Sequence, residues 1–197
     1  RVADHLQLGG QFVEFGVENY VEANTRFLLM NNNWRGLVID GDPSHIRYIQ
    51  KDNISWRHDL TFQCAFVSTE NINQILSSHR FTGEIGILSI DIDGNDFWIL
   101  DRIFKKRNPL VVIAEFNAMY TDSRAIRYNP NHEWAGDSYY GFTFKAGEKL
   151  AELHGYKVIF QIADMNMIMV RADLIEGLHV PEVNYKQNDY FKMSDRS

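Results

Sequence analysis

Three acidic residues follow an apolar run in the middle of the chain. The run Ile87–Ile90 is almost continuous, and Asp91, Asp93 and Asp96 come directly after it. Such a run is typical of a strand buried on both faces of a parallel sheet, and ligands bind at the carboxyl ends of these strands. A later apolar run ends in Glu115, so we expect its carboxyl group to lie beside that of Asp91.

These side chains could carry several kinds of chemistry. Asp91, Asp93 and Glu115 could bind Mg²⁺ or another hard cation, which prefers oxygen ligands. Asp91 or Glu115 could also hold a cofactor amino group or act as a general base. Some of these acids could have a purely structural role: Asp96, next to Asn95, stands where a helix begins and could cap it, and Asp93 could be a turn residue. A purely structural role is a weaker explanation for Asp91 and Glu115, because two neighbouring carboxylates repel each other unless another group compensates their charge.

Two earlier strand ends carry a glycine and further acids. Gly16 ends the first apolar run and would let the backbone turn tightly and approach a ligand. Asp40 and Asp42 follow the second run, where a carboxylate can accept both hydroxyl groups of a ribose. The pattern G-x-G-x-x-G is absent after Gly16, which disfavours NAD and FAD but not S-adenosylmethionine. The candidate cofactor-binding residues are Glu14, Gly16, Asn19, Asp40, Asp42 and Asp91.

A long polar and aromatic segment, roughly residues 117–140, follows the fifth apolar run. Its stretches Tyr128–Trp134 and Asp137–Gly141 could form a lid that shapes an acceptor pocket. His132 could act there as a base or as a metal ligand, although a single histidine in a loop is more often an ordinary surface residue.

The apolar pattern predicts an α/β fold that positions these residues. Expected strands are Gln11–Gly16, Gly36–Asp40, Cys64–Val67, Ile85–Asp91, Leu110–Phe116, Tyr156–Ala163 and Asn166–Val170. Helices are expected from about Asn24 (with Phe27, Leu28 and Met30 inward), after a Ser44 cap, after a Ser68 or Thr69 cap, around Phe97–Phe104 and over Phe142–His154. This alternation predicts a doubly wound, mostly parallel sheet. The tight turn at Asp164-Met165 predicts a closing antiparallel hairpin, a combination distinctive of class I methyltransferases.

Length and composition fit one domain. The 197 residues carry a formal net charge of −6, which argues against a nucleic-acid or anionic-membrane surface, since both need clustered cations. No apolar run is long enough to span a membrane. Cys64 is the only cysteine, which excludes an internal disulfide and fits the cytoplasm. We expect a single domain over residues 1–197 with a core of about residues 11–171; a start at Arg1 rather than Met leaves room for missing N-terminal sequence.

Four motifs resemble those of FkbM-like S-adenosylmethionine-dependent methyltransferases. The motifs are Phe12-Val13-Glu14-Phe15-Gly16, Ile39-Asp40-Gly41-Asp42-Pro43, Leu88-Ser89-Ile90-Asp91-Ile92-Asp93-Gly94-Asn95-Asp96 and Val112-Ile113-Ala114-Glu115. The third is the most specific, since this family typically has Ile-Asp-Val-Glu-Gly-x-Glu there. Two positions depart from the family pattern: Tyr20 stands near a usual glycine, and Asp93 stands where a glutamate is typical.

The resemblance implies a role for each matched residue. Glu14 and Gly16 would border the methionine part of the cofactor, and Asp42 would hold the ribose hydroxyls. Asp91 would lie near the reacting methyl group, with Glu115 beside the acceptor. Members of the family methylate hydroxyl groups, often on sugars or natural products, so the resemblance implies a small-molecule or glycan acceptor.

Two other functions remain open. Asp91-x-Asp93 is similar to the Asp-x-Asp of nucleotide-sugar glycosyltransferases, in which a metal bridges the diphosphate. That function explains the acids but not Gly16 or the closing hairpin. Tyr20 would instead suit a catalytically silent module that binds S-adenosylmethionine. The acceptor and the oligomeric state cannot be read from residue spacing.

Overall fold

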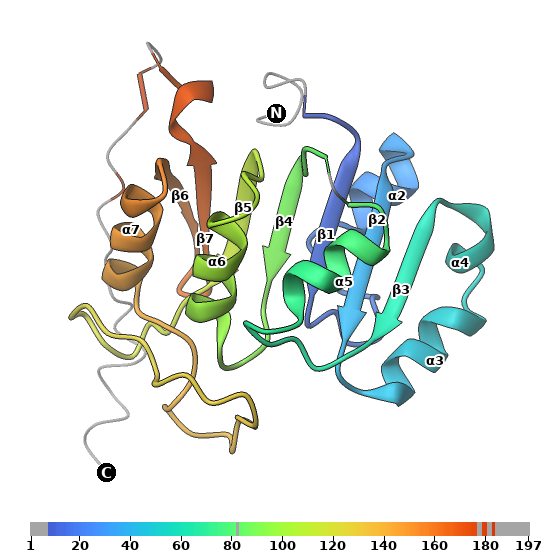
Figure 1. Cartoon of the computed structure of the whole chain (residues 1–197), viewed down its shortest axis with the longest axis horizontal. Coiled ribbons are helices and arrows are strands. Elements are labelled where there is room, and N and C mark those ends of the chain that lie inside the picture. The colour runs from blue at the N-terminus through green and yellow to red at the C-terminus, as the bar shows by residue number, and fades with distance from the viewer. Residues whose placement is uncertain (1–7, 82, 177–178, 181–182, 184–197) are drawn as a thin grey trace.

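A computed structural model describes residues 8–81, 83–176, 179–180 and 183. Within them, seven strands form one sheet in the order β3-β2-β1-β4-β5-β7-β6 (Figure 1). The strands are β1 (Gln11–Phe15), β2 (Arg35–Asp40), β3 (Leu60–Cys64), β4 (Ile87–Ile90), β5 (Val111–Glu115), β6 (Tyr156–Ile162) and β7 (Asn166–Arg171). Strands β1 to β5 pair in parallel, and β7 is antiparallel to both β5 and β6. The predicted doubly wound sheet with its closing hairpin is confirmed.

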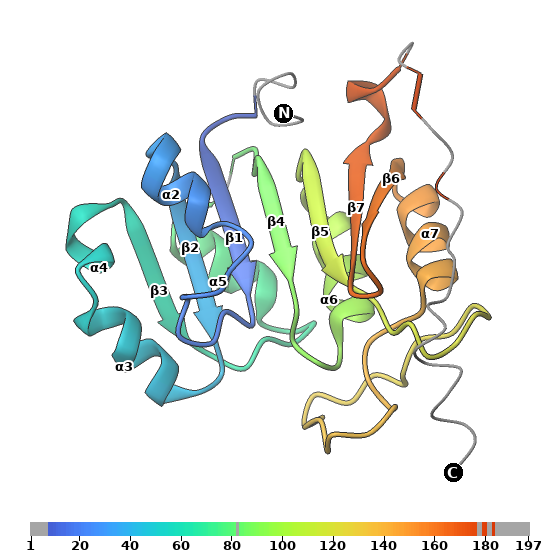
Figure 2. The ribbon, with the colours of Figure 1, turned by 180° about the vertical axis from the view of Figure 1, so that it is seen from behind.

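Helices lie on both faces of the sheet. They are α2 (Arg26–Asn32), α3 (Pro43–Lys51), α4 (Ile54–Arg57), α5 (Ile72–Ser78), α6 (Asp96–Phe104) and α7 (Phe144–Leu153), followed by the 3₁₀ turn η1 (Ala172–Leu174). Helices α5, α6 and α7 cover one face (Figure 1). Helix α2 lies against the other face (Figure 2), and α3 and α4 pack on the edge strand β3. None of the described helices is long and apolar enough to cross a membrane.

Each face of the sheet buries its own hydrophobic cluster, because side chains alternate along a strand. Val13 and Phe15 of β1 join the cluster beneath α5, α6 and α7, whereas Phe12 joins the cluster on the opposite face. Leu37 and Val38 of β2 divide in the same way. Burial on both faces explains the continuous apolar runs. Because β1 to β5 are parallel, their carboxyl ends meet at one edge of the sheet.

The third strand lies earlier than the sequence pattern predicts. We expected a strand at Cys64–Val67, but β3 begins at Leu60 and ends at Cys64. As an edge strand, β3 tolerates the half-buried polar residues Thr61 and Gln63 and needs no continuous apolar run. Residues 65–67 leave the sheet and line the cavity described below.

Helix α2 presents a different face to the core than predicted. Phe27 and Met30 are exposed, and Leu29 is the buried residue. The helix has only seven residues, so a single narrow stripe of it reaches the sheet. Leu28 is half-buried against the same cluster, as expected.

Two helix caps also differ from the prediction. Asp42 caps α3 by accepting a hydrogen bond from the N–H of Ser44 over 2.6 Å, so Ser44 is inside the helix. Asn71, rather than Ser68 or Thr69, precedes α5. Ser68 and Asn71 exchange side-chain to backbone hydrogen bonds in the turn before this helix. The cap position therefore lies three residues after Ser68, at Asn71. Most of the weakly patterned tail after Arg171 lies outside the described residues.

Candidate functional site

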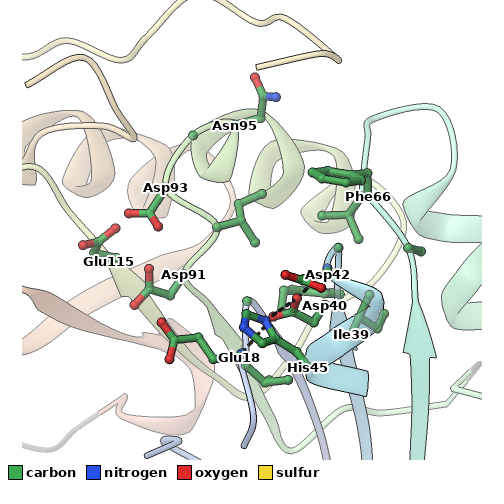
Figure 3. Close-up of a pocket in the computed structure, with 18 of the residues that line it drawn as sticks. Glu18, Ile39, Asp40, Asp42, His45, Phe66, Asp91, Asp93, Asn95 and Glu115 are labelled. Atoms are coloured by element: carbon green, nitrogen blue, oxygen red, sulfur yellow. Dashed lines mark hydrogen bonds and ion pairs between the residues drawn. The ribbon is translucent and has the colours of Figure 1, made fainter. Parts of the chain in front are cut away.

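A cavity of about 610 Å³ opens at the carboxyl edge of the sheet. Gly16, Asp40 and Asp91 line it from the exits of β1, β2 and β4, Phe66 from the loop after β3, and His132 from the long loop after β5. Figure 3 shows carboxyl groups on two sides of this space. Its volume falls in the range of protein ligand sites. The structure therefore brings the predicted strand ends to one cavity.

Asp91, Asp93 and Glu115 form an acidic cluster at one side of the cavity. One carboxylate oxygen of each lies within 4.8 Å of the others, and their carboxyl groups gather together in Figure 3. Burial raises the pKa of Asp91 and of Glu115, and neighbouring carboxylates raise both further. Near neutral pH this pair therefore holds a proton. The oxygens are close enough to bind a cation, which would have to displace that proton.

The loop between β4 and α6 owes its shape to the buried Asp96. Its two carboxylate oxygens accept hydrogen bonds from the backbone N–H of Ile92 (3.0 Å) and of Gly94 (2.9 Å). The turn that these bonds close holds Asp93 in a left-handed conformation, with φ of 51°. Asp96 stands at the start of α6, as expected, but its carboxylate shapes this turn instead of facing the cavity.

Asp40 organises the opposite side of the cavity. Its carboxylate accepts hydrogen bonds from the N–H of Glu18 and of Asp42, each over 2.8 Å, and lies 3.0 Å from Nδ1 of His45. Asp40 is buried, whereas Asp42 is exposed and lines the cavity beside it. The hydrogen bond from Ser44 lowers the pKa of Asp42, which stays ionised. Of the two predicted ribose ligands, Asp42 is the more accessible.

Gly16 turns the chain out of β1 at the edge of the cavity. Its φ is +70° and its N–H donates to the carbonyl oxygen of Ile39 over 3.0 Å. A Cβ at this position would lie 1.5 Å from the carbonyl oxygen of Asp91. The predicted tight turn is present, and it brings the exits of β1 and β4 together at a distance that only glycine permits.

Two predicted cofactor ligands lie outside the cavity lining, as far as the structure describes it. Glu14 is buried and accepts hydrogen bonds from the N–H of Asn24 (2.9 Å) and of Thr25 (3.1 Å) and from the Thr25 hydroxyl. Burial raises the pKa of Glu14. Oδ1 of Asn19 accepts from the N–H of Val21 over 3.0 Å. Both residues shape the segment between β1 and α2, because their polar atoms are bonded to its backbone.

Tyr20, the departure from the family pattern, also points away from the cavity. It has the left-handed φ of 61° that favours glycine. Its ring is fully buried in the cluster that includes Leu29, and its hydroxyl lies 3.0 Å from Oγ1 of Thr25. The larger side chain therefore leaves the cavity open.

Asn95 joins the long loop to the edge of the cavity. Its Nδ2 donates to the carbonyl oxygen of Asn129 (2.7 Å), and its Oδ1 accepts from the N–H of Asn129 (3.2 Å). The N–H of His132 donates to the same carbonyl (3.0 Å). The His132 ring packs on Gly94, where a Cβ would lie 2.5 Å from Cδ2. His132 thus lines the cavity, and within the described part of the chain its buried Nε2 has no hydrogen-bond partner.

Sequence reasoning missed Glu18, His45 and Phe66 as lining residues, and assigned Asn95 only to a helix start. These four residues stand on loops or in the first turn of a helix, outside the strand-end pattern. A signal existed for His45, because the third position of a helix faces back toward its cap, here Asp42. No local signal marks Phe66, which reaches the cavity only through the register of β3.

We expect Asn95→Ala to free the tip of the long loop while the rest of the protein stays folded. The substitution removes two hydrogen bonds of about 1 kcal/mol each, so backbone amide exchange at Asn129 and His132 should rise about 30-fold. Asn131→Ala is the matched control, since that side chain is exposed on the same loop. Equal exchange rates in the two variants would contradict the role of Asn95.

Comparison with known proteins places the fold. No protein-family model matches the chain, and no curated protein matches its sequence. The N-terminal domain of EvdMO1 with S-adenosylhomocysteine bound superposes with a TM-score of 0.56 at 8% identity, over 86% of this chain and 77% of that one. An S-adenosylmethionine-dependent methyltransferase from Clostridium acetobutylicum ATCC 824 gives 0.54 at 8% identity, over 86% and 87%. The fibrillarin/Nop5p complex gives 0.54 at 9% identity, over 82% and 72%.

The chain has the class I methyltransferase fold. At these identities the similarity concerns the fold alone. In the class I order seen here, the sequence of strands reverses between β1 and β4. Ligands of open α/β sheets bind where the order reverses. Gly16 and Asp91 stand at this point, so the cavity occupies the position at which this fold receives a ligand.

Proposed function

We propose that the chain is an S-adenosylmethionine-dependent methyltransferase that acts on a hydroxyl group of a sugar or natural-product-like small molecule. The cavity between the exits of β1 and β4 carries this proposal, because accessible Asp42 and the proton-holding pair Asp91 and Glu115 line the same space. We also propose that the chain is related to the FkbM-like family and that it acts in the cytoplasm. The EvdMO1 domain was also crystallised in the presence of S-adenosylhomocysteine and D-fucose, which supports a sugar acceptor.

The lining residues fit this cofactor. Ile39 and Phe66 offer an apolar surface on the side of Asp42 (Figure 3), and Val67 also lines the cavity. Such a surface suits a nucleobase. The Asp42 carboxylate has two acceptor oxygens for the ribose hydroxyls. Gly16 lines the cavity without a side chain, so the methionine part could approach the chain closely there. When bound, the cofactor supplies a methyl group that its sulfonium already makes electrophilic.

The acidic pair would orient the acceptor and take its proton. Asp91 lines the cavity next to Gly16. Glu115 lies on the far side of Asp91 from Asp42 (Figure 3). Burial raises the pKa of Asp91 to about 7, close to the pH at which a general base is most effective. His132 is the second candidate base, since its unpartnered Nε2 belongs to the same lining.

The two alternatives explain less. A nucleotide-sugar glycosyltransferase accounts for Asp91 and Asp93 but not for the closing antiparallel hairpin. A silent binding module rested on Tyr20, which is buried away from the cavity. A further hypothesis is that Asp91, Asp93 and Glu115 hold Mg²⁺. The titration described next tests this hypothesis as well.

Calorimetric titration with S-adenosylhomocysteine, with and without Mg²⁺, tests the proposal. We expect micromolar affinity, which corresponds to about −8 kcal/mol. Tighter binding with Mg²⁺ would support a metal at the acidic cluster. Absence of binding in both conditions would contradict the proposed function, and binding of a UDP-sugar with Mn²⁺ would favour the glycosyltransferase.

Asp42→Ala should weaken S-adenosylhomocysteine binding by about 1–3 kcal/mol, since buried ribose hydroxyls would lose their acceptor. The same change removes the cap of α3. Asp42→Asn is therefore the informative partner, because asparagine also caps a helix but offers only one acceptor oxygen. We expect an affinity between those of wild type and Asp42→Ala by calorimetry. Unchanged affinity in both variants would remove Asp42 from the site.

A further inference from the structure

The walls of the cavity carry acids from the exits of β1, β2, β4 and β5. Among the lining carboxyl side chains are Glu18, Asp40, Asp42, Asp91, Asp93 and Glu115. In the described part of the chain, no lysine or arginine lines the cavity, and His45 and His132 are its only basic side chains. A negative charge beside Asp91, Asp93 and Glu115 would therefore meet repulsion that no lysine or arginine of the lining offsets.

Backbone amides at this edge do not supply an anion site either. Phosphates commonly bind to free N–H groups at helix starts and strand-to-helix turns. At the start of α6, the N–H groups of Ile92 and Gly94 are bonded to the carboxylate of Asp96. The protein thus fills this anion position with a side chain of its own.

The exits of β1 and β2 show the same arrangement. Asp40 accepts hydrogen bonds from the N–H of Glu18 and of Asp42, and Asp42 accepts one from the N–H of Ser44. Internal carboxylates therefore occupy these three backbone donors as well.

His132 gives an independent indication of the ligand. Its Nε2 is buried without a partner in the described residues, and the ring is fixed against Gly94 beside the acidic cluster. An imidazole nitrogen donates or accepts a hydrogen bond according to its tautomer, and a carboxylate accepts one. A hydroxyl group, which both donates and accepts, would pair with either form of the ring and with a carboxylate beside it.

We infer that the acceptor is a neutral or cationic hydroxyl compound, and that phosphate esters, carboxylates and nucleic acids are excluded from the acceptor side of the cavity. This inference rests on the proposed function, because only a methyltransferase has a methyl acceptor in this cavity. It follows from the charge of the lining, and the N–H groups already bonded to Asp40, Asp42 and Asp96 support it. Binding of simple probes can therefore test it without knowledge of the natural substrate.

The experiment compares methylammonium with inorganic phosphate at matched ionic strength, on the full chain saturated with S-adenosylhomocysteine. Amide and side-chain NMR signals of Asp91, Asp93 and Glu115 report binding. We expect methylammonium to saturate these signals with an affinity at least about tenfold above that of phosphate. Asp93→Asn should weaken methylammonium binding, whereas Glu133→Gln, an exposed charge on the neighbouring loop, should not.

Three results would overturn the inference: phosphate binding equal to or tighter than that of methylammonium, phosphate binding that appears when Mg²⁺ is added, or no response to methylammonium. The preceding titration with S-adenosylhomocysteine separates this failure from that of the proposed function. If the cofactor analogue binds and phosphate is preferred, only the inference fails. If the analogue does not bind, the proposed function fails, and the charge preference of the cavity is then measured on the free protein.

Discussion

Gly16→Ala should cost about 4 kcal/mol or more in the free energy of unfolding, a large part of the total stability of a domain. The new Cβ would lie 1.5 Å from the carbonyl oxygen of Asp91, and no side-chain rotation can relieve a contact between two backbone-fixed atoms. The exits of β1 and β4 must therefore move apart. Urea denaturation followed by circular dichroism would show the loss, and S-adenosylhomocysteine affinity should fall with it.

Gly155→Ala separates the steric effect from the conformational one. Gly155 has a φ of +78°, close to that of Gly16, but a Cβ there would meet nothing within 4 Å. This variant should lose only about 1–2 kcal/mol, the usual cost of a left-handed conformation for alanine. If the two variants lose equal stability, the close approach of Gly16 to Asp91 is not what demands glycine.

Asp91→Asn should reduce methyl transfer by about 10²–10⁴-fold, the usual contribution of a general base, while the fold persists. Asparagine keeps the shape of the side chain but cannot accept a proton. Calorimetry should still detect S-adenosylhomocysteine, because Asp42 and Gly16 are unchanged. Asp59→Asn, at an exposed aspartate, controls for the loss of one negative charge. Full activity of Asp91→Asn would end the assignment.

The pH dependence of stability gives a second test of Asp91. Its pKa in the folded protein is raised to about 7, whereas an aspartate in an unfolded chain titrates near about 4. Between these values the folded state holds a proton that the unfolded state has released. The free energy of unfolding should therefore fall as the pH rises through this window. Asp91→Asn should flatten that fall, and an identical pH profile in both proteins would contradict the buried, protonated pair.

Much of the fold could be predicted from the sequence. Strands β1, β2, β4 and β5 are buried on both faces, so each is a continuous apolar run that ends in the glycine or acid at its exit. The tight turn before Asn166 indicated the antiparallel hairpin. The prediction failed where an element is only partly buried, at the edge strand β3 and at the short helix α2. The apolar residues of these two elements do not repeat regularly enough to mark their bounds or their buried face.

The sequence by itself determined which strand ends present a glycine or an acid, because four apolar runs lead to Gly16, Asp42, Asp91 and Glu115. Only the tertiary structure decided which acids reach the cavity. The sequence predicts a cofactor contact for Glu14 as it does for Asp42, yet Glu14 is buried and bonded to backbone N–H groups outside the cavity lining. The reason is physical. Burial, hydrogen-bond partners and the raised pKa of the acidic pair depend on residues distant in the chain, and the spacing of neighbouring residues does not predict those contacts.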